Sequence, residues 1–418
     1  MRFRFLTLLC TALALSLGVA ASASASTGNT LTVWLQVDAQ NGWPGVVAAA
    51  NNAFESSHPG WTVNVVYQQW SNHLANFDAT IAGNDTPDVI EMGNTEMTKY
   101  MASGAFANLG PYKSQFANSS HWLAGLQASA TYQHHLYGVP YYAGSRVVTY
   151  RSDLFRKAHI RTLPRSLAQF EADMIKIGKM EKHVKGFSPM YVGGEDWYTA
   201  LGFVFDYGGQ IAAYKHGRWV GELDSKNSLR GLDAFKTFFD DTQAKSTAKL
   251  DGTNPYPYTV YSQGKTAVLY GPAWYTCCTT AKGGPNYTKV TKQFVMPSHI
   301  PGKPMPGFLG GSDLAVPAQS PNRAEAVAWI ADFTSTASEK ALAAKGNIPN
   351  ATNLLSHSVN DQAAERSWFV PQAVNWVNVE NGNILKTMLG AFLSGQLTVK
   401  QAATIASQNI AYTLNQPS

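Results

Sequence analysis

The sequence predicts an α/β protein whose chain folds into two lobes joined by several crossings. Short apolar strand patterns alternate with helical patterns, which is typical of βαβ units and a mostly parallel sheet in each lobe. The chain has 418 residues, enough for two or three domains. It contains no internal repeat and no long linker, so two interwoven lobes fit better than separate domains in series.

The alternation begins with a strand over 31–35 and a helix over 44–54, for which Pro44 is a suitable first residue. A strand over 63–67, a helix over 71–82 and a strand over 88–92 come next. Ligands of such sheets bind at the carboxyl ends of the strands. The residues at those ends are Gln36, the segment 68–70 and the segment 91–95.

A second series of elements starts with an extended segment over 136–144, which leads into a strand over 147–150. Further strands are expected at 266–270 and within 308–316. The other expected elements are helices, and they make the C-terminal third of the chain mainly helical. These helices cover 166–180, 197–207, 228–240, 324–334, 339–345, 384–393 and 399–414.

Charged residues are scarce in this chain. They make up 14% of the sequence, whereas an average soluble domain has about 25%. Aromatic residues make up 12%, which excludes a disordered chain. The formal net charge is only +5, and two of the positive charges lie in an expected leader. Because such a balance gives no basic surface for phosphates, nucleic acid is not an expected partner.

The first 26 residues have the pattern of a signal peptide. Arg2 and Arg4 precede an apolar stretch over 5–21, and Ala/Ser repeats then offer cleavage sites. The stretch is too short for a membrane anchor. Cys10 follows Leu9 inside this stretch, so it lacks the small preceding residue that a lipid anchor requires. The mature protein is therefore expected in the periplasm or outside the cell, associated with its surface but without a lipid anchor at Cys10.

Cys277 and Cys278 are neighbours in the sequence. In an oxidising compartment they could form a vicinal disulfide. Two reduced thiols are the alternative, and the sequence leaves the choice between the two states open.

No strict catalytic or metal-binding motif occurs in the sequence, and neither a metal nor another cofactor is expected. Three acids near strand ends or ligand-facing loops, Glu91, Asp196 and Asp313, leave two alternatives open. A glycoside hydrolase would need two of them about 5–10 Å apart. A polyamine receptor would use several of them together. An anion receptor would need convergent basic residues, of which only Arg146 lies near a strand end.

Tryptophan occurs repeatedly at strand ends, at helix starts and in loops rich in Gly or Pro. An aromatic ring at such a place can stack on the C–H face of a sugar, and stacking that removes about 100 Å² of apolar area from water contributes about 2.5 kcal/mol. Core packing is the alternative for each ring. The candidate platforms are Trp34, Trp43, Trp70, Trp197, Trp274 and Trp376. The rings expected to pack or to lie in surface turns are Trp61, Trp122, Trp219 and Trp329.

Six short motifs, spread over nearly the whole mature chain, occur in the order found in one family. They are Phe54-Glu55 with His58-Pro59-Gly60, Pro87-Asp88-Val89, Asp153-Leu154-Phe155, Gly264-Lys265 through Trp274, Gly310-Gly311 through Val316, and Gly346 with Pro349. In this order the sequence resembles the extracellular sugar-binding proteins of ABC importers, the family that includes the maltose-binding protein.

The resemblance implies a periplasmic-binding-protein fold, in which two α/β lobes close over a sugar. The expected N-terminal lobe comprises 27–140 plus 271–311, and the expected C-terminal lobe comprises 141–270 plus 312–418. The resemblance also implies a monomeric receptor, not an enzyme, that delivers an oligosaccharide to the permease subunits of an importer.

The matching motifs assign Trp274 to sugar stacking and identify Trp197 and Tyr198 as the aromatic pair of the second lobe. Residues 311–313 would line the hinge side of the site. The complete set of residues expected to bind sugar is Gln36, Trp43, Trp70, Glu91, Asn94, Thr95, Tyr142, Arg146, Trp197, Tyr198, Trp274, Gly311, Ser312, Asp313 and Trp376.

Within the family, the segments 91–96, 103–109 and 376–385 are most similar to actinobacterial binders of chitobiose-type disaccharides. Binders of cellobiose, xylo-oligosaccharides and maltose share these pieces, so the identity of the sugar stays open. The expected function is capture of a neutral di- or trisaccharide. A receptor of the same fold for a polyamine and a glycan hydrolase are the alternatives.

Overall fold

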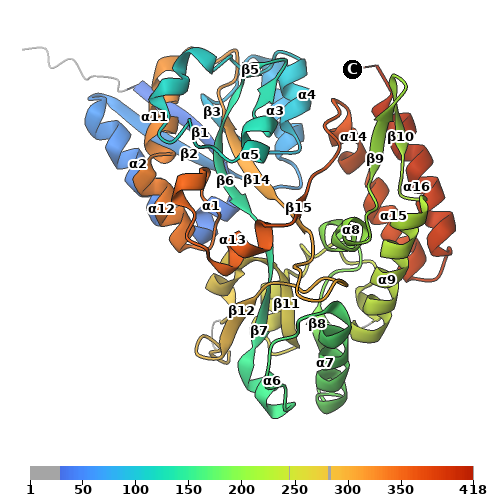
Figure 1. Cartoon of the computed structure of the whole chain (residues 1–418). Coiled ribbons are helices and arrows are strands. Elements are labelled where there is room, and N and C mark those ends of the chain that lie inside the picture. The colour runs from blue at the N-terminus through green and yellow to red at the C-terminus, as the bar shows by residue number, and fades with distance from the viewer. Residues whose placement is uncertain (1–28, 244, 281–283, 418) are drawn as a thin grey trace, which may run out of the picture.

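A computed structural model describes residues 29–243, 245–280 and 284–417 (Figure 1). The expected signal peptide and Cys10 lie outside the described residues. Within these ranges the chain forms two sheets, each with helices packed against it and each with its own core. The expected α/β architecture of two lobes is therefore confirmed.

The sheet of the first lobe has five strands in the order β2-β1-β3-β14-β6. These strands are β1 (Asn29–Gln36), β2 (Trp61–Gln68), β3 (Val89–Gly93), β6 (Gly138–Gly144) and β14 (Gly310–Ala315). β1 pairs in parallel with β2 and β3, whereas β14 is antiparallel to both β3 and β6. The sheet is therefore mixed.

The sheet of the second lobe has the order β12-β7-β11-β8. Its strands are β7 (Arg146–Arg151), β8 (Ser188–Tyr191), β11 (Thr266–Pro272) and β12 (Thr291–Phe294). Only β8 and β11 pair in parallel, and β7 is antiparallel to both of its neighbours. In each sheet all strands but one run in the same direction, and the exceptions, β14 and β7, are strands that enter from the other lobe. The expected mostly parallel sheet in each lobe is therefore confirmed.

Among the described residues, the α-helices that accompany the first sheet are α1 (Val37–Gly42), α2 (Pro44–Ser57), α3 (His73–Gly83), α4 (Met97–Ala102), α5 (Ala124–Ser129), α11 (Arg323–Phe333) and α12 (Thr336–Ala344). The last two are distant in sequence but lie against α2 (Figure 1). Leu31 and Val33 of β1, Phe54 of α2 and Ile330 of α11 are completely buried in one core.

The second sheet is accompanied by α6 (Ser152–Lys157), α7 (Leu167–Met180), α8 (Trp197–Asp206), α9 (Lys226–Thr242), α10 (Pro257–Ser262), α14 (Trp376–Asn381), α15 (Ile384–Leu393) and α16 (Val399–Leu414). Their apolar faces form the largest core, with Phe203, Phe235 and Phe392 at its centre. Several begin with a hydroxyl cap. Ser166 caps α7, and Thr398 caps α16 together with Gln401, which satisfies N–H groups that the first helical turn leaves free.

The lobe boundaries differ from the expected division. β12, Phe308 and the last two residues of β11 belong to the second sheet or its core, although 271–311 was expected in the first lobe. The orange strand β14 lies inside the first sheet, and α11 and α12 stay with that core, although 312–418 was expected in the second lobe (Figure 1). The reason is that β14 enters between β3 and β6, which keeps the next helices on the first lobe.

Within the described part of the chain, three connections join the lobes. The chain passes from β6 to β7 at Ser145, and it returns through Leu309 immediately before β14. The third connection includes α13 (Val359–Ala364) and β15 (Ser367–Trp368), which pairs with β13 (Gly307–Phe308). The fold also has shorter strands: β4 (Thr131–Tyr132), β5 (His135–Leu136), β9 (Ala212–Lys215) and β10 (Arg218–Gly221).

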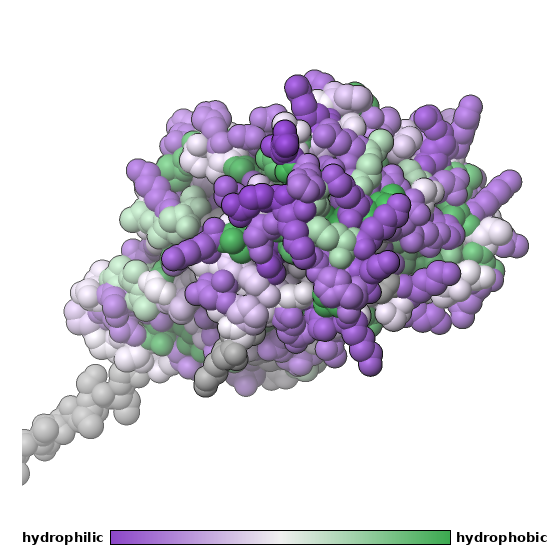
Figure 2. Space-filling view, turned by 90° about the horizontal axis from the view of Figure 1, so that it is seen from below, coloured by the Kyte–Doolittle hydropathy of each residue, from purple (hydrophilic) through white to green (hydrophobic). Residues whose placement is uncertain are grey.

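The face in Figure 2 is covered mainly by hydrophilic side chains, with hydrophobic ones scattered among them. No helix among the described residues is long and apolar enough to cross a membrane.

Candidate functional site

Glu91 lies at the carboxyl end of β3 and is fully buried beside β1. The backbone N–H of Gln36 donates to Glu91 Oε2 at 2.8 Å. Burial raises the pKa of Glu91 to about 7, although Gln36 and the nearby Ser312 hydroxyl lower it. Among the described residues, neither Glu91 Oε1 nor Ser312 Oγ has a hydrogen bond of normal geometry. This end of the sheet therefore holds polar atoms that the first lobe does not satisfy by itself.

Asp38, two residues after β1, faces aromatic residues of both lobes. The indole N–H of Trp70 donates to Asp38 Oδ2 at 2.9 Å. Burial raises the pKa of Asp38, and the hydrogen bond from Trp70 lowers it. Burial raises the pKa of Tyr142 in β6, and the charges of Glu91 and Asp38 raise it further. Asp38 and Tyr142 therefore lie close together at the edge of the first lobe.

Three tyrosines from the second lobe approach Asp38: Tyr256, Tyr258 and Tyr275. Burial is the main cause of a raised pKa for each of them, and the charge of Asp38 adds to it. For Tyr258 the result is a pKa of about 12. Tyr256 stacks on Tyr258 with ring centroids 5.0 Å apart. The charge of a carboxylate of one lobe thus acts on several phenol groups of the other.

Trp274 follows β11 and lies at the junction of these groups. Its ring is 4.8 Å from Tyr275 and 6.3 Å from Tyr258, and it meets Trp43 of the first lobe edge-on at 6.2 Å. It is 9% exposed and packs with the first core, although β11 belongs to the second sheet. The Trp274 side chain therefore spans the two lobes.

Arg146, at the start of β7, forms a two-pronged ion pair with Asp196. Its two terminal nitrogens lie 2.8 and 3.1 Å from the two Asp196 oxygens. Thr199 also donates to Asp196 at 2.9 Å. The guanidinium lies 5.2 Å from the centre of the Tyr198 ring. The ion pair thus fixes the N-terminal end of α8, where the predicted aromatic pair begins.

Trp197 and Tyr198 stack on each other with centroids 3.8 Å apart. Tyr198 is half-buried and also lies 4.7 Å from Phe308. Burial raises the pKa of Tyr198 well above its usual value, and the charges of Glu380 and Glu96 raise it further. The Tyr198 ring therefore reaches the region where both lobes supply acids.

Thr95 and Glu96 follow β3 and approach Glu380 of α14. A hydrogen bond joins Thr95 to the Glu380 carboxyl, which also accepts one from the Trp376 indole. Burial raises the pKa of Glu380 to about 7, and the charge of Glu96 adds to this shift. Trp376, Thr95 and His73 lower it. This is a second place where the two lobes meet.

The residues of β14 lie at the base of this region. Gly311 accepts a hydrogen bond from the Asn94 backbone at 2.9 Å, and a Cβ at Gly311 would lie 2.2 Å from the Tyr142 carbonyl oxygen. Asp313 is held by Ser129 at 2.8 Å, and burial raises its pKa to about 7. The close approach of β6 and β14 therefore requires glycine at position 311.

Two expected sugar platforms are core residues. Trp43 is completely buried, and its indole N–H donates to Tyr141. Trp376 is 1% exposed and donates to Glu380. Neither ring has an open face because other aromatic rings enclose it: Trp43 contacts Tyr142 at 5.3 Å, and Trp376 contacts Trp197 at 6.3 Å. Trp43 and Trp376 were expected to stack on the sugar, but in the structure they pack in the cores and support neighbouring rings.

Sequence reasoning missed several residues of the region: Asp38, Tyr256, Tyr258, Tyr275 and Glu380. Signals for them exist. Asp38 is two residues from a predicted strand end, Tyr275 adjoins Trp274, and two tyrosines flank Pro257. What the sequence lacks is a sign that these segments converge.

The acids singled out for hydrolysis each have a separate partner. Asp196 pairs with Arg146, Asp313 accepts from Ser129 and Glu91 accepts from Gln36. Cys277 and Cys278 form a disulfide. Among the described residues, no group of three or more His, Cys, Asp or Glu side chains could hold a metal ion.

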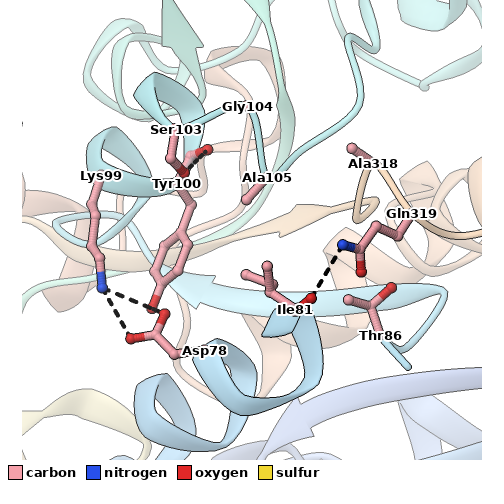
Figure 3. A pocket seen from close by; sticks show the side chains of 10 residues that line it. All are labelled: Asp78, Ile81, Thr86, Lys99, Tyr100, Ser103, Gly104, Ala105, Ala318 and Gln319. Carbon is pink, nitrogen blue, oxygen red and sulfur yellow. Dashed lines mark hydrogen bonds and ion pairs between the residues drawn. The ribbon is translucent and has the colours of Figure 1, made fainter. Parts of the chain in front are cut away.

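A pocket of about 490 Å³ lies on the first lobe between α3, α4 and the segment after β14 (Figure 3). Its polar side chains bind one another. Lys99 and Tyr100 both reach Asp78, and Gln319 donates to the carbonyl oxygen of Ile81. None of the expected sugar-binding residues lines it. The candidate site is therefore the region between the lobes.

The fold resembles solved sugar receptors. The GacH receptor of Streptomyces glaucescens, solved without ligand and with acarbose, superposes with a TM-score of 0.79 at 20% identity over 94% of this chain and 100% of that one. Maltose-bound MalE3 of T. maritima gives a TM-score of 0.76 at 16% identity, covering 92% of this chain and 99% of the other. At these identities the likeness shows the fold.

Sequence comparison gives the family. The diacetylchitobiose binding protein DasA of Streptomyces coelicolor is 28% identical over 391 residues, which cover 91% of this chain and 89% of that protein. The family model for bacterial extracellular solute-binding proteins matches residues 36–340. The match spans well over half of the chain and includes strands of both sheets. The chain therefore belongs to the bacterial extracellular solute-binding proteins.

Proposed function

We propose that this protein is an exported receptor that captures a neutral oligosaccharide between its lobes and delivers it to an ABC importer. One observation carries the proposal: carboxyl and amide groups at the strand ends of the first lobe face stacked aromatic rings of the second. Carboxylates accept hydrogen bonds from sugar hydroxyls, while rings such as Tyr198 cover the apolar faces of the sugar. A ligand that contacts both lobes only when they are together favours the closed state.

A disaccharide of the chitobiose type is the first candidate ligand. The support is the 28% identity to a diacetylchitobiose binding protein over nearly the full length of both chains. The two basic side chains of the region are already matched by acids, Arg146 by Asp196 and His73 by Glu96, which leaves no free cation for an anionic ligand. The proposed partners are the permease subunits of the importer. We propose that the receptor is a monomer without catalytic activity and without a lipid anchor at Cys10.

The test is a calorimetric screen of di- and trisaccharides, with tryptophan fluorescence followed alongside. At least one sugar is expected to bind with a Kd below about 100 µM, which corresponds to about 5.5 kcal/mol. Chromatography of the same mixtures after several hours should show intact sugar. Spermidine, a polyamine, is included to test the alternative of a polyamine receptor. Tight spermidine binding without sugar binding would contradict the proposal, and released monosaccharide would indicate a hydrolase.

Trp274→Ala is expected to weaken binding of the best sugar about five- to thirtyfold, equivalent to about 1–2 kcal/mol. The reason is that the ring spans the lobes beside Tyr258 and Tyr275. Trp219→Ala in β10 is the control, because Trp219 lies against Tyr214 in a hairpin of the second lobe. Calorimetry measures both affinities, and thermal unfolding shows that both variants are folded. Equal affinities for the two variants would assign Trp274 to packing alone.

A further inference from the structure

Basic side chains gather at the edge of the second sheet that lies opposite the candidate site. β7 ends at this edge, where Arg151 pairs with Thr291 of β12, and β8 and β11 begin side by side at Ser188 and Thr266. The candidate site is at the other end of these strands, where β7 begins with Arg146. The exposed side chains that form this basic edge are Arg156, Lys157, Lys179, Lys182, Lys185 and Lys289.

The charges of the chain are unevenly distributed. The formal net charge of +5 was the reason to expect no basic surface. Residues 29–144, which form most of the first lobe, contain two Lys or Arg and seven Asp or Glu, whereas residues 145–190 contain ten Lys or Arg and four Asp or Glu. Because opposite charges on different lobes cancel in the sum, a small net charge is compatible with a strongly positive surface at one end of the molecule.

Contacts between side chains and backbone bring three parts of the basic edge together. Lys157, the last residue of α6, lies 2.7 Å from the carboxylate of Glu181, which directly follows α7. Lys265, just before β11, donates to the backbone carbonyl oxygen of Lys185 at 2.9 Å. The ends of α6 and α7 and the turn that leads to β8 therefore meet, at the lower end of the second lobe in Figure 1.

The turn before β12 reaches the same edge. The backbone N–H of Ser152, the first residue of α6, donates to the carbonyl oxygen of Val290 at 2.8 Å. The Arg151 guanidinium lies 3.7 Å from the centre of the Tyr287 ring. Lys289 lies between these two contacts in the chain and is therefore held next to α6.

The acids of this edge do not neutralise it. Glu181 is buried and is shared by Lys157 and His183, which lie 2.7 and 3.7 Å away. Asp153 accepts two hydrogen bonds from Arg151, at 2.8 and 2.6 Å. The exposed cations that form no ion pair with another described residue are Arg156, Lys179, Lys182, Lys185 and Lys289. The edge therefore keeps several positive charges in contact with solvent.

Helix ends explain only part of this group. The C-terminal end of a helix favours cations, which accounts for Arg156 and Lys157 in α6 and for Lys179 in α7. Lys182 and Lys289 lie outside the helices. Like charges that lie close together repel each other, and this repulsion is relieved when an anionic surface approaches. The excess charge therefore favours an anionic partner.

We propose that the basic edge docks the protein onto anionic phospholipid headgroups of a membrane. Long exposed side chains without a shared pocket suit a surface of many phosphates better than one small anion. Each Lys or Arg near an anionic membrane is expected to strengthen binding about fivefold. The inference rests on the proposed function, because a receptor that serves an importer must approach a membrane. The sugar site lies at the opposite end of the strands and stays accessible.

Sedimentation of the protein with phospholipid vesicles tests the docking. The protein is expected to bind vesicles of phosphatidylcholine mixed with phosphatidylglycerol, and not vesicles of phosphatidylcholine alone. Binding at about 0.1 M NaCl should be lost at about 1 M, where the Debye length falls from about 10 to about 3 Å. Absence of binding to the mixed vesicles, or equal binding to both kinds, would overturn the proposal.

Two triple variants of equal net charge test the position of the docking surface. Replacement of Lys179, Lys182 and Lys185 by Gln should weaken vesicle binding at least about twentyfold. The control replaces three exposed lysines of the first lobe and α16 by Gln, and it should bind vesicles as the wild type does. These lysines are Lys340, Lys345 and Lys400. Equal losses in both variants would show that overall charge, and not the basic edge, attracts the protein to the vesicles.

Two further measurements separate the possible partners and the two proposals. Soluble polyphosphate should not replace the vesicles: tight binding to it without vesicle binding would identify another polyanion as the partner and overturn the membrane. In calorimetry, the triple variant at 179, 182 and 185 should bind the best sugar of the screen as the wild type does. If no sugar binds to the wild type, the receptor proposal fails, while the vesicle experiment still decides whether the basic edge docks on a membrane.

Discussion

Replacement of Asp206 by alanine is expected to lower the free energy of unfolding by about 3–5 kcal/mol, the cost of removing one partner from a buried ion pair. Asp206 ends α8, and its side chain is completely buried. It accepts hydrogen bonds from Ser298 Oγ at 2.6 Å, from the His299 backbone N–H at 2.8 Å and from Arg366 at 3.1 Å. One carboxylate therefore connects a helix, a loop and the third connection between the lobes.

Denaturant unfolding of the wild type and of the Asp206→Ala variant measures this loss. Without the carboxylate, the buried Ser298 hydroxyl and the His299 backbone N–H lose their acceptor, and buried polar groups without partners are costly. The control is Asp240→Ala, which removes an exposed pair with Lys236 and should cost less than about 1 kcal/mol. A loss of less than 1 kcal/mol for Asp206→Ala would show that water replaces the carboxylate without penalty.

The alternation of strands and helices was sufficient to predict two α/β lobes, because the hydrophobic periodicity of each segment is local information. The direction of a strand within its sheet, in contrast, cannot be predicted from the sequence of that strand alone. β14 has the short apolar pattern of any strand, and nothing within 310–315 shows that it enters between β3 and β6 in the opposite direction. The lobe boundary depends on this pairing, so the predicted division failed after residue 271.

Sequence reasoning identified candidate residues where a polar side chain directly follows or ends a predicted strand. Gln36 and Glu91 are such residues, and the structure joins them by a 2.8 Å hydrogen bond. Asp38 and Tyr258 were missed because their proximity depends on how the lobes meet. Trp43 illustrates the opposite error: its place beside a helix start suggested exposure, but the rings of Tyr142 and Trp274 enclose it.

The ion pair of Asp196 changes the role that is inferred for this residue. In the sequence it is an isolated acid beside Trp197, compatible with catalysis or with a cationic ligand. In the structure it binds Arg146, which lies in strand β7, 50 positions away. The guanidinium neutralises the acid and in turn contacts the Tyr198 ring. The pair thus positions an aromatic residue of the proposed sugar site.

Asp196→Ala is accordingly expected to weaken sugar binding at least about tenfold and to lower the free energy of unfolding by about 3 kcal/mol. The Arg146 side chain is 17% exposed, so removal of Asp196 leaves a largely buried cation without its partner. That cation lies beside Tyr198, whose position would change. Calorimetry with the best sugar and denaturant unfolding measure the two effects.

A second variant separates the cost of the unpaired Arg146 charge from the loss of the Tyr198 position. Arg146→Met in the Asp196→Ala background removes the unpaired charge, and it should restore at least half of the lost stability. Asp153→Ala is the matched control, since Asp153 forms the same two-pronged contact with Arg151 but is 34% exposed. That control should cost about 1 kcal/mol or less and leave sugar affinity unchanged. If Asp196→Ala bound sugar as the wild type does, the ion pair would stabilise the second lobe without positioning Tyr198 for the ligand.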